Sequence, residues 1–346
     1  FWYEAPDWKR HEMQKPGDYG DGLKGYSKVF AVWADDFNGD GYPDALVIDF
    51  PGAPAYWLEN PKGAADKHWP RHPVWPSACN ESPQYVDLLG TGKRVLLMGA
   101  QPKGKENEGQ MAYFTPDPKA PTGPWVLHPV SGPTPAGGKP APGTHRFAHG
   151  LGAADLNGDG RRDVLCTGGW WEQPAKPDGV TPWAFHPANL GDACADMHTA
   201  DLDGDGKLDV ISTSAHKYGI WWHKQRPAGA DGHPGFEKKE LFPELVSETH
   251  AAHFADIDGD GLRDLVTGKR RFSHGRSEPG SSDPAVVYWL KAARRPDGTI
   301  GFDPQVVDED SGIGTQFEVT DLDGDGLSDV VTANKNGVHV LLQKRK

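Results

Sequence analysis

The sequence predicts an all-β protein, a propeller of four-stranded antiparallel blades. An acidic nine-residue motif recurs along the chain, β-branched and aromatic runs follow its copies, and no amphipathic helix pattern separates them. The chain also contains 44 glycines and 31 prolines among 346 residues, a content that favours turns and strands over helices. Recurring units of this kind are typical of solenoids and propellers.

The acidic motif occurs five times in full, with its first aspartate at positions 36, 155, 201, 256 and 321. A sixth, degenerate copy runs from Asp87 to Val95. The first positions of successive copies lie 46 to 68 residues apart. A four-stranded blade needs roughly 40–50 residues, so the longer spacings indicate insertions such as the Pro/Gly-rich segment 131–143.

Each unit has the same predicted order of strands. A short strand of small residues (252–255) precedes the motif, a β-branched run (164–167) follows it, and an aromatic strand (220–222) and a fourth strand (302–307) come next. Segments 1–4 and 8–11 resemble the third and fourth strands of an incomplete unit. We therefore predict one domain over 1–346 with seven blades, the partial N-terminal blade closing with the C-terminal strands. Six blades, with the two termini sharing one, are the alternative.

The motif predicts calcium-binding loops between strands. Oxygen side chains stand at positions 1, 3, 5 and 9, and glycines at positions 4 and 6 allow the positive φ of a tight wrap. Hard oxygen ligands without nitrogen or sulfur select Ca²⁺. We expect about five structural Ca²⁺ sites, with these ligands: Asp36, Asn38, Asp40, Asp44, Asp155, Asn157, Asp159, Asp163, Asp201, Asp203, Asp205, Asp209, Asp256, Asp258, Asp260, Asp264, Asp321, Asp323, Asp325 and Asp329.

Two variations define this loop further. An EF-hand would need flanking helices and a Glu at position 12, whereas these motifs lie between strands and carry residues such as Val47 or Thr332 there. In the degenerate unit Leu89, Thr91 and Val95 replace three ligands. We predict a turn without an ion at that unit.

Composition limits the partners and the compartment. A formal net charge of −13 argues against nucleic acid, which needs a basic face, and five calcium ions would bring the charge close to neutral. No run of 18 apolar residues is present, so we expect no membrane span. The three cysteines form no disulfide framework, and Cys166 is expected to be buried. Because weak calcium sites fill outside the cytosol, we predict a secreted or periplasmic protein whose targeting segment precedes Phe1.

The motifs starting at Asp36, Asp155, Asp201, Asp256 and Asp321 resemble the FG-GAP/VCBS repeats of integrin-type propellers over almost the whole chain. The resemblance implies that the calcium loops lie on one rim and stabilise the blades. It does not fix the function, because such propellers include adhesion modules, sugar-binding modules and lyases. Function is expected on the opposite face.

Polar residues gather at the predicted entries to the inner strands and in the turns after the second strands. His198 and His253 both lie three residues before their motifs, and Trp33, Gln84 and Glu318 hold the same place, which predicts a ring around the axis. As catalytic candidates we take His198, His253, His149, His250, His216, Tyr218, Lys269 and Arg270. As substrate-binding candidates we take Trp170, Glu81, Gln316, Glu318, His274 and Lys335.

These residues favour a carbohydrate lyase or dehydratase that acts by β-elimination on a keto-sugar or a uronic-acid saccharide. His198 or His253 would act as the base, with the other or Tyr218 as the acid, and Lys269 and Arg270 would stabilise the developing charge. A further divalent metal on this face is part of the hypothesis. The chain is more loosely similar to the propeller of aldos-2-ulose (anhydrofructose) dehydratases, although it has no cupin domain.

Two other functions remain open. A non-catalytic module would bind glycan or protein on the same face. Hydrolysis by two carboxylates has less support, because the acids Glu81, Asp196, Glu248 and Glu318 show no recognisable pairing. Most aromatic pairs are expected to pack between blades, and Trp170 is the one that we expect to stack on a sugar. The sequence does not indicate an oligomeric state.

Overall fold

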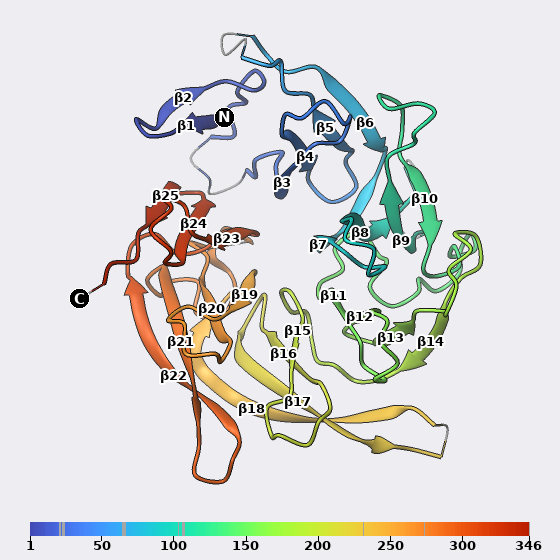
Figure 1. Ribbon diagram of the computed structural model, residues 1–346, viewed down its shortest axis with the longest axis vertical. Coiled ribbons are helices and arrows are strands. Elements are labelled where there is room, and N and C mark those ends of the chain that lie inside the picture. The colour runs from blue at the N-terminus through green and yellow to red at the C-terminus, as the bar shows by residue number, and fades with distance from the viewer. Residues whose placement is uncertain are drawn as a thin grey trace.

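The computed structural model describes residues 1–20, 22, 25–63, 67–102, 104–105, 108–230, 232–272 and 274–345. Its sheets form a ring around a central axis (Figure 1). The first three blades consist of β3 (Ala31–Asp35), β4 (Asp44–Ile48), β5 (Ala55–Leu58) and β6 (Arg71–Trp75); β7 (Ala78–Val86), β8 (Val95–Ala100), β9 (Gln110–Thr115) and β10 (Val126–Pro129); and β11 (Gly152–Ala154), β12 (Asp163–Cys166), β13 (Gly169–Glu172) and β14 (Ala184–Pro187).

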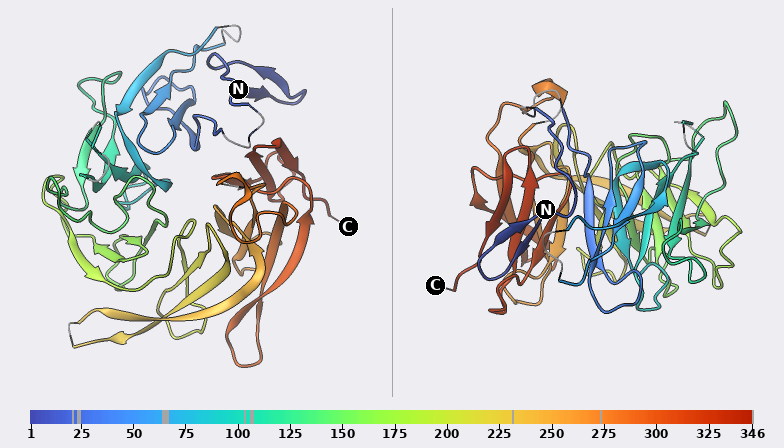
Figure 2. Two further views of the ribbon diagram at one scale, coloured as in Figure 1. Left: turned by 180° about the vertical axis from the view of Figure 1, so that it is seen from behind. Right: turned by 90° about the horizontal axis from the view of Figure 1, so that it is seen from above.

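The remaining blades repeat this antiparallel order from the axis outward. They consist of β15 (His198–Ala200), β16 (Asp209–Thr213), β17 (Tyr218–Ala228) and β18 (Pro234–Ser247); β19 (Ala252–Ala255), β20 (Asp264–Lys269), β21 (Val286–Arg294) and β22 (Ile300–Asp308); and the three-stranded β23 (Phe317–Thr320), β24 (Asp329–Asn334) and β25 (Gly337–Leu341). A short 3₁₀ helix, η1 (His274–Arg276), lies between β20 and β21 and projects from one face of the ring (Figure 2).

The propeller has six blades, so the prediction of seven is wrong and the alternative count of six is confirmed, but the two termini do not share a blade. The N-terminal strands β1 (Trp2–Glu4) and β2 (Lys9–His11) exist as predicted, but they form a separate two-stranded sheet. The hairpin lies between the first and last blades at the periphery (Figure 1). Two short, mostly exposed strands offer too little apolar surface to build another blade.

Side chains at the start of the last blade join it to the first blade. The Gln316 amide accepts a hydrogen bond from Val32 N (2.7 Å) and donates one to Val32 O (3.1 Å). The Thr315 hydroxyl donates to Phe30 O at 2.7 Å. The ring is thus closed by side chains that bond the backbone of β3 and its approach. Gln316 is predicted to bind substrate, and in the structure its side chain bonds the backbone of Val32 and connects the last blade to the first.

The core lies between neighbouring blades. All residues of the second strands β4, β8, β12, β16 and β20 are buried, as expected for strands covered on both faces. The aromatic residues of the third strands, such as Trp57 and Trp171, pack in the same clusters. Cys79, Cys166 and Cys194 are buried free thiols, which confirms the prediction for Cys166.

The acidic loops share one hydrogen-bond pattern. In the loop that starts at Asp201, the Oδ1 of this residue accepts Gly204 N (2.8 Å) and Asp205 N (3.1 Å), and its Oδ2 accepts Gly206 N (2.9 Å). Gly204 and Gly206 have φ of 74° and 83°. A Cβ on either glycine would meet no atom within 4 Å, so glycine is required there by the backbone conformation rather than by space.

The last aspartate of each motif ties the loop to the third strand. In Asp264 one carboxylate oxygen accepts Ile257 N (3.1 Å) and the other accepts Ala292 N from β21 (2.7 Å). The same pair of bonds recurs at Asp44, Asp163, Asp209 and Asp329. These carboxylates are buried.

No described helix is long and apolar enough to cross a membrane.

We predict that Asp264→Asn lowers the free energy of unfolding by about 2–3 kcal/mol. The amide keeps one acceptor oxygen, but its NH₂ group would face a backbone N–H and leave that donor unpaired. Chemical denaturation measures the effect. Asp310→Asn, at an exposed turn, is the control and should change stability by less than about 0.5 kcal/mol. Equal effects of the two substitutions would contradict a structural role for the last aspartate.

Candidate functional site

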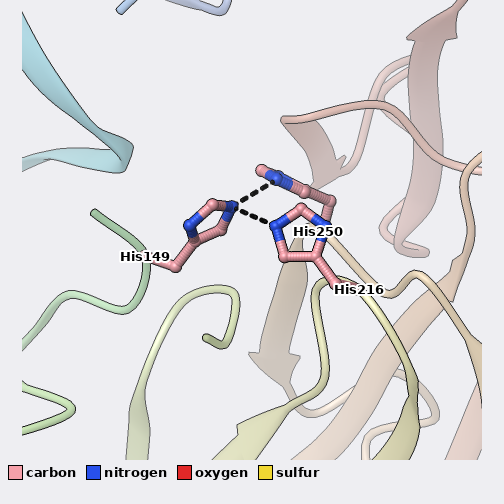
Figure 3. Close-up of side chains that lie close together, drawn as sticks. All are labelled: His149, His216 and His250. Carbon is pink, nitrogen blue, oxygen red and sulfur yellow. Dashed lines mark hydrogen bonds between the residues drawn. The ribbon is translucent and has the colours of Figure 1, made fainter. Parts of the chain in front are cut away.

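Three histidines and a glutamate from four consecutive blades converge on one face of the ring. His149 precedes β11, His216 lies between β16 and β17, His250 precedes β19, and Glu81 belongs to β7. The Nε2 of His149 lies 2.9 Å from His216 Nε2 and 3.1 Å from His250 Nε2 (Figure 3). Glu81 Oε2 lies 3.1 Å from His250 Nε2 and 3.4 Å from His149 Nε2. We call these four residues the His₃Glu centre.

Local backbone features place Glu81 and His149 side by side. Asn80 has a positive φ of 78°, and β7 is irregular between Cys79 and Gln84. The Asn80 side chain accepts Ser82 N at 2.7 Å, which fixes this bulge in the way that Asx turns do. Glu81 N then donates to Ala148 O at 2.7 Å. The bulge therefore joins the inner strand of the second blade to the segment that carries His149.

The partners of the outer ring nitrogens define the protonation of two histidines. His149 Nδ1 lies 2.9 Å from the Phe147 carbonyl oxygen, and His216 Nδ1 lies 2.7 Å from Glu278 Oε1. Only an N–H can donate to these acceptors, so both Nε2 atoms of the neutral rings present lone pairs. Two lone pairs 2.9 Å apart repel unless a cation or a shared proton lies between them.

The His₃Glu centre has the arrangement expected for a divalent metal site. Nitrogens bound to one zinc-like ion at about 2.1 Å lie roughly 3.0–3.4 Å from one another, close to the spacing found here. Metal-binding histidines commonly donate their other N–H to a carbonyl or carboxylate, as His149 and His216 do. Burial lowers the pKa of His250 to about 3, helped by the charge of Arg270. Burial alone would raise the pKa of Glu81, but the neighbouring His149 and His250 imidazoles lower it.

A second layer of side chains surrounds Glu278. Its Oε1 accepts from both His216 and His274, and its Oε2 lies 3.7 Å from Arg270 Nη2. His274 stacks on His216 with ring centroids 5.3 Å apart, and it is exposed. Since its Nδ1 donates to Glu278, the neutral ring of His274 has its lone pair on Nε2. The structure thus adds an exposed imidazole of defined tautomer beside the centre.

Lys269 and Glu248 form a buried ion pair next to this layer. Lys269 Nζ lies 2.6 Å from Glu248 Oε2 and 3.0 Å from Arg270 O, and the lysine is 1% exposed. Glu248 also accepts from Ser281 and has a positive φ of 52°. Lys269 therefore supports the loops that carry His250 and Arg270 instead of presenting a charge to the open face.

The predicted ring around the axis is confirmed as a location. Trp33, Gln84, His198, His253 and Glu318 line a cavity of about 440 Å³. His198 Nε2 bonds Ala252 O (2.8 Å), His253 Nε2 bonds Phe317 O (2.6 Å), and Gln84 bonds Leu151 O (2.8 Å). Each acceptor belongs to the next blade or to the segment that enters it. These side chains connect neighbouring blades, and their predicted roles in catalysis and binding stay untested.

Trp170 is the residue for which the prediction is wrong. It is 0% exposed and packs against His186 with ring centroids 4.4 Å apart. A fully buried indole has no free face for a sugar, and the prediction rested on the position of Trp170 next to the turn that precedes β13. Of the other candidates, Tyr218 donates to Asp283, and Lys335 lines a separate cavity beside Arg270.

Sequence reasoning missed Glu278, Tyr26 and Phe272. Glu278 follows His274 by four residues, but it lies in an insertion between β20 and β21 that has no counterpart in the repeat. Tyr26 belongs to the irregular segment before β3, and its hydroxyl accepts His274 N at 3.1 Å. Only the fold brings these parts together. No spacing in the sequence could have shown it.

Residues 155–212 and 201–267 match a family model described as FG-GAP-like repeat. The chain therefore carries FG-GAP-like repeats arranged as a β-propeller, and this part of the predicted resemblance is confirmed. No curated protein matches the chain. The looser likeness to aldos-2-ulose dehydratases stays a prediction.

Two solved structures illustrate the similarity. One is an Agrocybe aegerita lectin that recognises non-reducing terminal N-acetylglucosamine, with 20% identity, a TM-score of 0.48, and coverage of 94% of this chain and 83% of that one. The other is the V. cholerae biofilm matrix protein Bap1, with 15% identity, a TM-score of 0.37, and coverage of 86% and 43%. The functional argument therefore rests on the side chains of this chain.

We predict that stability falls as the pH is lowered from about 6.5 to about 4, in part because of His198. Burial lowers the pKa of His198 to about 4 from its usual 6.5. Between these values the unfolded chain binds the proton and the folded protein does not, so acid favours unfolding by an amount on the order of 3 kcal/mol from this group.

Chemical denaturation across this pH range, compared with His198→Gln, measures the contribution. The glutamine can keep the hydrogen bond to Ala252 O but does not titrate, so the pH dependence should flatten. His68→Gln, at an exposed histidine, should leave the wild-type slope unchanged. A slope that is the same in His198→Gln as in the wild type would show that this histidine titrates normally.

Proposed function

We propose that the protein is a divalent-metal-dependent carbohydrate lyase whose reaction is β-elimination. The observation that supports it is the convergence of three imidazole nitrogens and a carboxylate at one face of the ring. His149, His216, His250 and Glu81 would hold the ion. A set of three nitrogens and one oxygen suits zinc and related transition metals better than calcium. When bound, such an ion would withdraw electron density from a carboxylate or carbonyl of the sugar.

In this proposal the protein's own groups bind the sugar and move one proton. His274 takes the proton from the carbon next to the carboxylate or carbonyl. The C–O bond at the neighbouring carbon breaks, its electron pair leaves with the oxygen, and a C=C bond forms. The leaving oxygen takes a proton from solvent, so atoms and charge balance.

His274 is favoured over His198 and His253 as the base for a geometric reason. Its Nδ1 donates to Glu278, which leaves Nε2 with the lone pair that a base needs. It is exposed and stacks on His216, a proposed metal ligand. The Nε2 atoms of His198 and His253 are already engaged by backbone carbonyl oxygens.

We also propose that the five complete acidic loops bind calcium and support the blades. In the loops Asp201–Asp205 and Asp256–Asp260, the carboxylate oxygens of positions 1, 3 and 5 lie within 4.8 Å of one another. Asp203 Oδ1 is buried without a hydrogen-bond partner among the described residues, as a ligand oxygen would be. The last aspartate of each loop would take part with lone pairs not used by its backbone donors. Calcium at these sites would agree with a secreted or periplasmic protein.

We predict that the purified protein contains about one transition-metal ion and that His149→Ala loses it. Removing one of four ligands lowers metal affinity well beyond the 10- to 100-fold typical of outer partners. Elemental analysis gives the stoichiometry. Absorbance of the new conjugated double bond, followed on keto-sugars and uronic-acid polysaccharides, gives the activity. His149→Ala should lack both the metal and the activity.

Two further variants complete this experiment. His274→Gln should keep the metal but reduce elimination by about 10²–10⁴-fold. His68→Gln, far from the centre in sequence and exposed, should change neither. A wild-type protein that binds no transition metal would refute the centre. Metal binding with retained glycan binding but no elimination on any substrate would favour the binding module instead.

We predict that Asp201→Ala lowers the calcium stoichiometry by one, whereas Asp87→Ala leaves it unchanged. Both aspartates accept backbone N–H groups of their loops, so both variants lose similar hydrogen bonds. Of these two loops, only the one at Asp201 carries a full set of ligands. Calorimetric titration with Ca²⁺ after chelation counts the sites. In the wild type, saturating calcium should raise stability by about 2.7 kcal/mol per site at 100 times Kd.

An equal calcium stoichiometry in the wild type and in Asp201→Ala would contradict the proposal for this loop. Loss of one ion in Asp87→Ala would contradict the prediction that the degenerate unit is a turn without metal.

A further inference from the structure

A cavity of about 710 Å³ lies beside the His₃Glu centre. It is formed where residues 17–20, 22 and 25–30, the segment after β20 and the turn between β24 and β25 meet. Arg270 belongs to its lining and has Nη2 3.7 Å from Glu278 Oε2, and the lining residue Tyr26 bonds His274 N. The cavity therefore touches the layer that holds His216 and His274. Its volume falls in the range of small-molecule sites.

Arg270 is a buried cation with unused donors. It is 7% exposed, and neither its Nε nor its Nη2 makes a hydrogen bond to any described residue. The 3.7 Å separation from Glu278 is too long for a hydrogen bond. Nε–H and one N–H of Nη2 share an edge of the guanidinium, the fork that binds a carboxylate with two parallel bonds. A buried donor without a partner costs free energy, so this edge fits an anionic ligand.

Other lining residues add positive charge and aromatic surface. Lys335 Nζ lies 4.4 Å from the ring centroid of Tyr26 and 4.5 Å from that of Phe272. Burial lowers the pKa of Lys335, and the charge of Arg270 lowers it further. Arg271 also lines the cavity, and Asp18 is the acidic residue in the described lining. Cations outnumber carboxylates here, in a protein whose formal net charge is −13.

We propose that this cavity binds a uronic-acid saccharide, with Arg270 and Lys335 pairing with the sugar carboxylate and the half-buried Tyr26 contacting the ring. A carboxylate is the anion that matches the free edge of Arg270, and aromatic faces suit the C–H surface of a pyranose. This choice of substrate class rests on the proposed lyase function, since pairing the carboxylate with cations makes the neighbouring C–H more acidic. The binding itself can be tested without turnover.

The experiment is isothermal titration of the full metal-replete chain, carrying His274→Gln to remove the proposed base, with trigalacturonate and with the neutral maltotriose. We expect trigalacturonate to bind at least 10-fold more tightly, with an affinity that falls as salt is raised. Lys335→Met should weaken trigalacturonate binding about 10-fold and leave maltotriose unaffected. The half-buried methionine keeps the contacts with both rings, so the fold should survive. Lys238→Met is the matched control, because Lys238 lies 4.2 Å from the Trp221 ring centroid on another blade.

Equal affinity for the two sugars, or unchanged trigalacturonate binding in Lys335→Met, would overturn this inference. Weakening by Lys238→Met to the same degree would also overturn it, because the effect would then be one of general charge. The lyase proposal fails separately. Charge-selective binding without elimination supports the cavity and refutes the reaction, whereas elimination from a neutral keto-sugar without uronate binding supports the reaction and refutes the cavity.

Discussion

The structure depends on a carboxylate that is buried at the end of every acidic loop. This last aspartate accepts one N–H from its own loop and one from the third strand of its blade or the residues directly after it, as Asp209 does with Leu202 N (3.2 Å) and Gln225 N (2.7 Å). The two bonds fix the loop against the sheet. They also explain why this position is Asp in all five complete motifs. A longer or neutral side chain could not accept both donors at this distance.

Residues in and next to the acidic loops also connect neighbouring blades. The side-chain amide of Gln225 in β17 donates to Leu156 O of the preceding loop at 2.9 Å. Gln173, directly after β13, donates likewise to Leu88 O at 2.8 Å. Arg162 and Arg263, both at position 8 of their motifs, donate to Asp87 O and Thr199 O of the preceding blade. Each loop thus holds its own blade together and also contacts its neighbour.

The repeated part of the protein could be predicted from the sequence, because each copy must satisfy the same local constraints. The loops, the buried second strands and the ring that includes His198 and His253 follow from position within the motif. The blade count failed at the N-terminal hairpin, since paired strands are visible in the sequence but their attachment to a blade is not. The partners of His216 could not be predicted either, because Glu278 lies in an insertion outside the repeat.

The inner strands link the two ends of the propeller. His149 precedes the inner strand β11, and the acidic loop at Asp155 follows this strand. His250 and the loop at Asp256 lie before and after the inner strand β19 in the same way. The His₃Glu centre takes each ligand from a different blade, so a shift of one blade by about 1 Å would spoil its geometry. Bonds that hold neighbouring blades in register at the loop end therefore also preserve the distances among the histidines at the other. In this fold the repeated loops stabilise the frame, and residues outside the motif supply the chemistry.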